Sequence, residues 1–430
     1  MCCSVVINHL PKHFGYAENS EKVNGKNMSS RKLTREFYQN HSAASYILTA
    51  DIIVMLPLSE NIASVPPSAT MAMNNKSKEM SAAGIDVISL AVGEPDFATP
   101  AHITRAAIDA LNRGETHYAP SRGIPELTNA VAEKLRRENN LPYDAKQVLI
   151  TSGAKDAIRI TMTACLNPGD EVIILDPAWV SYDPAVKIAR GKPVHHHLNE
   201  NFQVDESLFD AITDKTKMII VNSPSNPTGS VLARSSLRLI ADACIDHDLY
   251  CMSDEIYEKL VYGKEHVSIG SLPDMAERTI TINGFSKAFA MTGWRLGYLA
   301  APASVIPYMD KVMQHSVGNV TTFSQWGGVA ALTGDQTCVE DMRKEFEKRR
   351  KYVIGRLAGM GLSTAPAEGA FYAFVKVDGD DNAIANKWLE EAHVACTPGF
   401  AFGSPGWIRM SYAASMERLE EALDRIEKVL

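Results

Sequence analysis

The sequence predicts an α/β protein with a large domain built on a mainly parallel seven-stranded sheet and a smaller α+β domain. Through the middle of the chain, short runs rich in valine and isoleucine alternate with helical stretches. Strands separated by helices of roughly ten residues or more are typical of a parallel sheet covered on both faces. The 430 residues exceed what one hydrophobic core usually supports. From Thr321 onward long helices replace the alternation, which predicts a second domain.

The predicted elements follow this pattern in chain order. Apolar runs predict strands at residues 87–92, 148–151, 172–175, 218–221, 249–253, 279–283 and 296–300. Helical periodicity predicts helices at residues 100–113, 125–140, 155–165 and 235–247. The link between the last two strands is mostly loop, so this pair is the expected exception to parallel order. Beyond it we expect a charge-laced, solvated helix at 337–360, strands at 370–375 and 407–411, and a final helix at 415–430.

Four regions are expected along the chain. Residues 1–54 are rich in Asn, Ser and Lys with little periodicity, which favours a disordered extension or a start codon placed too far upstream of Met55. Acidic residues in this stretch argue against an organelle transit peptide. Residues 55–99 are expected to form an amino-terminal arm and part of the small domain, residues 100–317 the large domain, and residues 318–430 the rest of the small domain.

Composition excludes several classes of function. The chain has 45% hydrophobic and 22% charged residues, the balance of a globular protein, and its net charge of −8 argues against nucleic acid or an anionic membrane as partner. No stretch approaches the roughly 20 apolar residues that span a bilayer. The seven cysteines include no CxxC pair, and the consecutive His195, His196 and His197 would alternate faces on a strand. We therefore expect a cytoplasmic protein without a metal site or disulfides, with the three histidines in an exposed or edge segment.

A lysine-containing segment carries the chemistry. Lys287 lies in Asn283-Gly-Phe-Ser-Lys-Ala-Phe-Ala-Met-Thr-Gly-Trp-Arg-Leu-Gly297, after a predicted strand and among small and apolar neighbours. Desolvation lowers the pKa of such a lysine and favours the neutral amine that attacks aldehydes. Four further segments occur in a consistent order: Thr151-Ser-Gly-Ala-Lys155, Asn222-Ser-Pro-Ser-Asn-Pro-Thr-Gly229, Ser253-Asp-Glu-Ile-Tyr257 and Trp407-Ile-Arg-Met-Ser411. Singly, each suits a turn or a core strand.

Together these segments resemble the fold-type I pyridoxal-phosphate aminotransferases of class I/II, most closely the bacterial and archaeal aspartate aminotransferase branch. The resemblance covers Met55 to Leu430. It implies an enzyme that uses pyridoxal 5′-phosphate to move an amino group between aspartate or glutamate and a 2-oxo acid such as 2-oxoglutarate or oxaloacetate. It also implies a homodimer with shared active sites.

The resemblance assigns three catalytic residues. Lys287 matches the lysine that forms the Schiff base with the cofactor and shuttles the substrate's proton. Asp254 matches the partner of the pyridine nitrogen, which keeps the ring electron-withdrawing. Tyr257 and Asn226 match the hydrogen-bond partners of the ring hydroxyl O3′. Trp179 matches the aromatic residue that stacks on the ring, and both Trp179 and Asn226 are implied to contact the substrate.

The phosphate requires a site for a dianion. A strand-to-helix junction offers backbone N–H groups and the positive end of the helix dipole. The residues matched to phosphate ligands are Ser152, Gly153, Ala154, Ser286 and Arg295. Tyr118 matches a tyrosine that reaches the phosphate of the neighbouring subunit.

Substrate contacts are implied in the same way. Arg409 matches the arginine that grips the α-carboxylate through two parallel hydrogen bonds, and Gly93 matches the glycine whose backbone approaches that carboxylate. Lys155 and Thr70 match residues that face the distal carboxylate in the aspartate-type branch. Arg122, where the resemblance demands no basic residue, either alters the pocket or is solvated.

Other functions stay open at this stage. Related enzymes accept prephenate or aromatic amino acids with the same residues, and β-lyases and amino-acid synthases share the fold. A non-catalytic effector-binding module would require a DNA-binding segment, but residues 1–54 contain no helix-turn-helix pattern or basic stripe.

Overall fold

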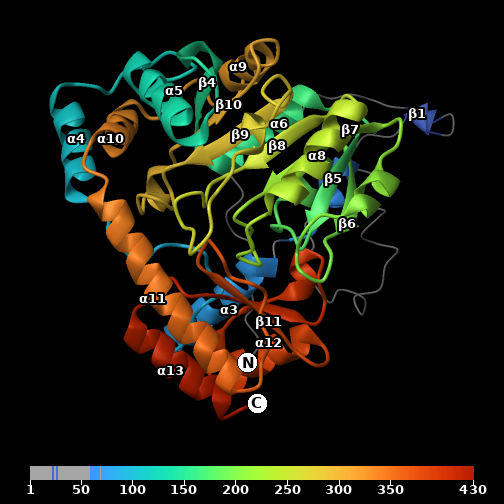
Figure 1. The fold of residues 1–430 in the computed structure, drawn as a ribbon, viewed down its shortest axis with the longest axis vertical. Coiled ribbons are helices and arrows are strands. Elements are labelled where there is room, and N and C mark those ends of the chain that lie inside the picture. The colour runs from blue at the N-terminus through green and yellow to red at the C-terminus, as the bar shows by residue number, and fades with distance from the viewer. Residues whose placement is uncertain (1–21, 24–25, 28–58, 68) are drawn as a thin grey trace. The chain divides into compact units, whose positions relative to one another are not determined.

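The computed structural model describes residues 22–23, 26–27, 59–67 and 69–430 (Figure 1). The expectations for residues 1–54 and Met55 therefore lie outside the described residues, except for a short antiparallel pair, β1 (Lys22–Val23) and β2 (Lys26–Asn27). Residues Leu58–Leu430 form one compact unit, in which the first helices are α2 (Glu60–Ala63) and α3 (Ala69–Ala82).

The large sheet has the seven strands that the fold class predicts. They are β4 (Val148–Thr151), β5 (Glu171–Asp176), β6 (Lys192–His197), β7 (Thr216–Asn222), β8 (Tyr250–Asp254), β9 (Thr279–Gly284) and β10 (Gly297–Ala300), in the spatial order β4-β10-β9-β8-β7-β5-β6. Strands β5 to β9 run parallel. Strand β10 is antiparallel to both β9 and β4, so the expected exception is confirmed.

One predicted strand of this sheet is wrong. Of residues 87–92, only Ile88–Ser89 form a strand, β3, and it pairs in parallel with β12 (Val394–Ala395) outside the large sheet. The seventh strand is instead β6, which contains the three histidines and pairs with β5 at the sheet edge. An edge strand has one open side and tolerates polar residues, so β6 has no continuous apolar run to reveal it.

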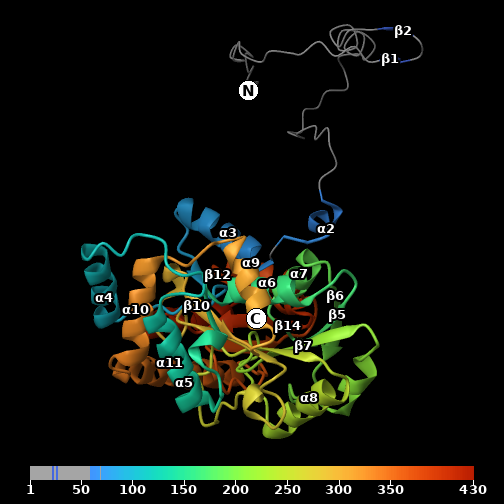
Figure 2. The same ribbon diagram turned by 90° about the horizontal axis from the view of Figure 1, so that it is seen from above.

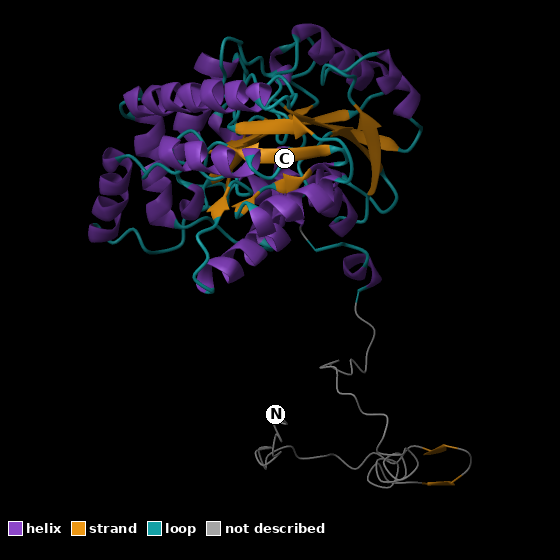
Figure 3. Cartoon of the chain, turned by 90° about the horizontal axis from the view of Figure 1, so that it is seen from below, coloured by secondary structure: helices purple, strands orange, loops and turns teal. Residues whose placement is uncertain are grey.

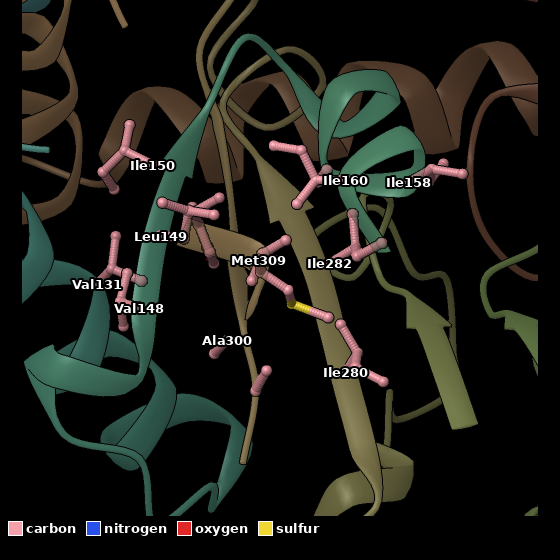
Figure 4. Packing of buried hydrophobic residues seen from close by; sticks show 14 of the residues in the cluster. Val131, Val148, Leu149, Ile150, Ile158, Ile160, Ile280, Ile282, Ala300 and Met309 are labelled. Atoms are coloured by element: carbon pink, nitrogen blue, oxygen red, sulfur yellow. The ribbon is translucent and has the colours of Figure 1, made fainter. Parts of the chain in front are cut away.

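Helices cover both faces of the sheet, as Figure 2 shows from above. In β7, Met218 and Ile220 face the core that includes α6 (Ala154–Cys165) and α7 (Tyr182–Ile188), whereas Ile219 and Val221 face the core under α8 (Arg234–Asp246). This alternation follows from the two-residue period of a strand. Figure 4 shows the first core, where Ile158 and Ile160 of α6 lie near Ile280 and Ile282 of β9. Four further helices complete this part: α4 (Ala101–Asn112), α5 (Pro125–Asn139), α9 (Ile306–Gln314) and α10 (Thr322–Thr333).

A second core surrounds the smaller sheets. Strands β11 (Tyr372–Lys376), β14 (Trp407–Ser411) and β13 (Thr397–Pro398) form an antiparallel sheet. The long helix α11 (Thr337–Gly359), α12 (Asp381–Glu391) and α13 (Met416–Glu427) pack with it, at the lower part of Figure 1. Figure 3 shows strands enclosed by helices. The predicted domain boundaries remain predictions. None of the helices in the described ranges is long and apolar enough to cross a membrane.

Candidate active site

A pocket of about 380 Å³ opens where β7 and β8 end and α6 begins, and strands β11 and β14 close its other side. The carboxyl ends of parallel strands are the usual ligand position in open α/β sheets. The pocket brings together eleven of the predicted residues: Gly93, Ala154, Lys155, Trp179, Asn226, Asp254, Tyr257, Ser286, Lys287, Arg295 and Arg409. They come from sequence positions more than 300 residues apart and meet only in the folded chain.

The remaining predicted residues lie elsewhere. Ser152 and Gly153 adjoin the pocket at the start of α6. Tyr118 is 98% exposed and does not line the pocket of its own chain. Thr70 lies in α3, but its side chain is outside the described ones. Arg122 pairs with Asp310 at 3.0 Å and donates to the Lys146 carbonyl, so it does not shape this pocket.

Lys287 follows β9, is half-buried and lines the pocket. Burial lowers its pKa to about 8, against the opposing influence of the Glu94 carboxylate. Its Nζ donates to the Gly93 carbonyl at 2.5 Å and lies 5.7 Å from the centre of the Phe371 ring. An amine with a pKa near 8 is partly neutral at physiological pH, which is the form that attacks a carbonyl.

Asp254 is the last residue of β8 and is fully buried. Burial raises the pKa of its carboxyl to about 6, although Tyr182 donates a hydrogen bond to it at 2.7 Å and the Ile256 N–H donates at 3.3 Å. Asn222, at the end of β7, donates to the Asp254 backbone carbonyl at 3.0 Å. A buried carboxyl of this kind gains from a nearby cation, so it suits a protonated ring nitrogen.

The start of α6 forms an anion-binding cradle. No side chain caps this helix within the described part of the chain, and the first N–H groups of a helix lack internal partners. Gly153 has φ +80°, and a Cβ atom there would lie 2.7 Å from the Arg295 guanidinium. Arg295 donates to the Ser152 and Thr292 carbonyls, which aligns its charge with the helix end. Glycine thus lets the Arg295 guanidinium approach the start of the helix, so that a positive charge and free backbone N–H groups lie side by side, as an anion-binding site requires.

Arg409, on β14, is 2% exposed and faces the pocket. Its Nη1 donates to Asn226 Oδ1 at 2.9 Å, which leaves the Asn226 amide Nδ2 as a donor toward the pocket. The buried Nε of Arg409 has no partner among the described residues. A buried guanidinium with an unused donor is suited to a carboxylate ligand.

Trp179 and Lys155 lie side by side in the pocket wall. The Lys155 ammonium is 5.0 Å from the centre of the Trp179 ring, and Tyr182 meets that ring edge to face at 5.4 Å. Partial burial, and then the positive charge of Arg295, lower the pKa of Lys155. The wall therefore offers an aromatic face and a positive charge.

The pocket residues that sequence reasoning missed include Glu94, Tyr182, Asn222 and Tyr372. Asn222 begins one of the recognised segments, but no local pattern showed that Asn222 and Tyr182 both contact Asp254. Tyr372 lies on a strand among apolar neighbours, where a core position is the ordinary interpretation. The Glu94 carboxylate accepts a hydrogen bond from Thr292 and lies close enough to influence Lys287.

A buried polar cluster lies behind the site. Glu255, Glu258 and His266 place carboxylate and ring atoms within 4.8 Å of one another. The Lys134 ammonium pairs with Glu258, and Asn139 donates to both carboxylates. An internal cation thus already neutralises Glu258, one of the two carboxylates of this cluster.

Comparison with known proteins agrees with the fold. The family model for aminotransferase class I and II matches residues 85–426. An aspartate aminotransferase of Pyrococcus abyssi is 49% identical over 365 residues, which cover 81% of this chain and 93% of that protein. An aromatic-amino-acid aminotransferase of Thermococcus litoralis is 47% identical, with coverage of 81% and 93%. The solved aspartate aminotransferase of Thermus thermophilus with maleate superposes with a TM-score of 0.84 at 43% identity, covering 87% of this chain and all of that one.

The fold and the pocket define an α/β enzyme of the pyridoxal-phosphate class. The chain belongs to the aminotransferase class I and II family. It is a pyridoxal-phosphate-dependent aminotransferase, and its substrates are an amino acid and a 2-oxo acid.

Proposed function

We propose that this aminotransferase acts on the acidic amino acids aspartate and glutamate, with 2-oxoglutarate and oxaloacetate as acceptors. The observation that carries the proposal is Lys155, a positive charge in the pocket in addition to Arg409 and to Lys287 and Arg295, which are assigned to the cofactor. A dicarboxylic substrate presents two carboxylates, and each needs a cationic partner when it leaves water. The names of the relatives from Pyrococcus abyssi and Thermus thermophilus support the same substrate class.

The donor set of the pocket fits pyridoxal phosphate. We assign the phosphate to Ser152, Gly153, Ala154, Ser286 and Arg295, because they form or adjoin the cradle at the start of α6. Trp179 would stack on the ring, while Asn226 and Tyr257 would donate to its O3′. When bound, the cofactor's pyridinium ring withdraws the electron pair released at the substrate's Cα.

The side chains of the pocket supply the remaining steps. Asp254 holds the proton on the ring nitrogen, and its own pKa falls once it gains that cationic partner. Lys287 carries the cofactor and then, as a free amine, takes the proton from the substrate's Cα. Arg409 binds the α-carboxylate with Gly93 beside it. Lys155 binds the distal carboxylate, with assistance from Thr70.

A homodimer in a reducing cytoplasm is part of the proposal. Tyr118 is almost fully exposed, as required of a side chain that reaches the phosphate in a neighbouring subunit. The five described cysteines are free thiols, which suits a reducing compartment. Sedimentation of the purified holoenzyme tests the dimer, and Tyr118→Phe should weaken cofactor retention if the sites are shared.

A second candidate is an aromatic or prephenate aminotransferase. The 47% identity to the aromatic enzyme of Thermococcus litoralis favours it, as does the half-buried ring of Trp179 beside Lys155 in the pocket wall. A screen of purified protein with twenty amino donors against 2-oxoglutarate and oxaloacetate separates the two. The proposal expects the highest kcat/KM for aspartate or glutamate, and a clear preference for phenylalanine or tyrosine would replace it with the second candidate.

A further inference from the structure

Tyr372 connects three residues of the pocket, although sequence reasoning gave it no role. It lies on β11, is 1% exposed and lines the pocket. That hydroxyl is 2.7 Å from the hydroxyl of Tyr257, and the Arg409 guanidinium lies 4.7 Å from the centre of its ring. A Cβ atom at Gly93 would be 1.9 Å from the Tyr372 oxygen, so glycine at position 93 makes room for this hydroxyl.

The direction of the hydrogen bond between the two phenols decides where one proton points. Each hydroxyl has one proton, so one phenol must donate to the other. If Tyr372 donates, the proton of Tyr257 is free to turn into the pocket. If Tyr257 donates, its proton is used within the pair.

The surroundings favour Tyr372 as the donor. Burial raises the pKa of both phenols, and the positive charge of Arg409 opposes this at both. The Arg409 guanidinium lies directly over the ring of Tyr372, 4.7 Å from its centre, whereas the ring of Tyr257 meets the uncharged Phe371 ring edge to face at 5.5 Å and 88°. The more acidic phenol of a hydrogen-bonded pair is the better donor, and Arg409 lies against the ring of Tyr372.

We propose that Tyr372 is a positioning residue: it donates to the Tyr257 oxygen and thereby directs the Tyr257 proton toward the cofactor's O3′. The inference rests on the proposed function, in which Tyr257 donates to O3′. The hydrogen bond from Tyr372 also polarises the Tyr257 hydroxyl, which strengthens the hydrogen bond that Tyr257 donates. The absorbance of the lysine-bound cofactor changes with pH. A hydrogen bond that stabilises the ionised O3′ lowers the pH midpoint of this change.

The test uses the holoenzyme and the substitution Tyr372→Phe, which removes one oxygen from a ring that stays in place. The absorbance midpoint should rise by roughly half to one pH unit, since one hydrogen bond has about that worth. Tyr257→Phe should also raise the midpoint. The double variant should rise no further than Tyr257→Phe alone, because Tyr372 acts through Tyr257. An unshifted Tyr372→Phe, or fully additive shifts, would overturn the inference.

Tyr412→Phe is the matched control. Tyr412 is also fully buried in the same core and donates to the Ala370 carbonyl at 3.3 Å, but it does not line the pocket. Removal of the Tyr412 hydroxyl should leave the absorbance midpoint unchanged. A shift equal to that of Tyr372→Phe would mean that the shift in Tyr372→Phe is a general structural effect.

Gly93→Ala perturbs the same hydroxyl from the other side. The added Cβ displaces the Tyr372 oxygen, so this variant should also raise the midpoint. If Tyr372→Phe does not fold, an unshifted Gly93→Ala overturns the inference. Cofactor uptake by the wild-type protein distinguishes a failure of this inference from a failure of the proposed function. If the wild type does not take up pyridoxal phosphate at Lys287, the proposed function itself is refuted. A normal wild-type titration with unshifted variants would refute the role of Tyr372 alone.

Discussion

Substitution of Lys155 tests which part of the pocket selects the substrate. Lys155→Ala removes the ammonium beside Trp179 and leaves Arg409 in place. A charge-assisted hydrogen bond contributes about 1.5–3 kcal/mol, whereas an exposed ion pair contributes about 0.2–1 kcal/mol. Lys155 is exposed in the open pocket and becomes covered by substrate, so we expect a loss of about 1–2 kcal/mol. That corresponds to a roughly 5- to 30-fold fall in kcat/KM for aspartate and glutamate.

The assay should follow one half-reaction, in which the holoenzyme is mixed with an amino acid and the cofactor absorbance is recorded. This avoids 2-oxoglutarate, which is itself a dicarboxylate. Lys155→Met keeps the aliphatic stem against Trp179 and should reproduce the loss, whereas Lys155→Arg should keep most of the preference. Because the pKa of Lys155 is lowered, the aspartate-to-phenylalanine ratio should fall at a lower alkaline pH than for an ordinary lysine. An equal loss with phenylalanine would refute the assigned role.

Three further substitutions test the rest of the site. Lys287→Ala should abolish transamination and the pH-dependent cofactor absorbance, and turnover like that of the wild type would contradict its assignment. Arg409→Lys loses the two-pronged contact, so it should raise the dissociation constants of mono- and dicarboxylate inhibitors alike, by roughly 10- to 100-fold. A selective effect on one class of inhibitor would argue against the assignment of Arg409 to the α-carboxylate. Asp254 has a raised pKa of about 6, so its ionisation destabilises the cofactor-free fold as pH rises from about 4 to 6. Asp254→Asn should therefore raise the free energy of unfolding of the cofactor-free protein in urea at pH 8, by up to about 3 kcal/mol, and by about half as much at pH 5. Equal stability of variant and wild type at both pH values would refute the raised pKa of Asp254.

Most of the large sheet could be predicted from local pattern. Strands β5, β7 and β8 are buried on both faces, so their sequences are continuous apolar runs that stand out from the helices between them. The edge strand β6 lacks that signal because solvent reaches its open side. Residues 87–92 carry the signal but find their partner in β12, more than 300 positions later, and no local pattern encodes a pairing of that range.

The charged helix α11 illustrates the same limit. Its charge pattern predicts a solvated face, and Arg343 pairs there with Glu340 and Glu347. Arg349, on the same helix, is instead 5% exposed and pairs with Asp96 at 2.6 Å. The burial of Arg349 depends on the loop that packs over the helix, which comes from far earlier in the chain.

Local sequence was enough to predict the catalytic chemistry. A lysine among small residues, an acid at a strand end and an arginine on a late strand occur in the chain order that is typical of one enzyme family. These are local features, since each depends on neighbours within a few residues. The pKa values and hydrogen bonds of these residues, by contrast, depend on the tertiary structure. The pKa of Asp254 depends on burial and on Tyr182, and the surroundings of Tyr257 depend on Tyr372 and Arg409. Desolvation and hydrogen-bond direction arise from residues that meet only when distant segments pack together.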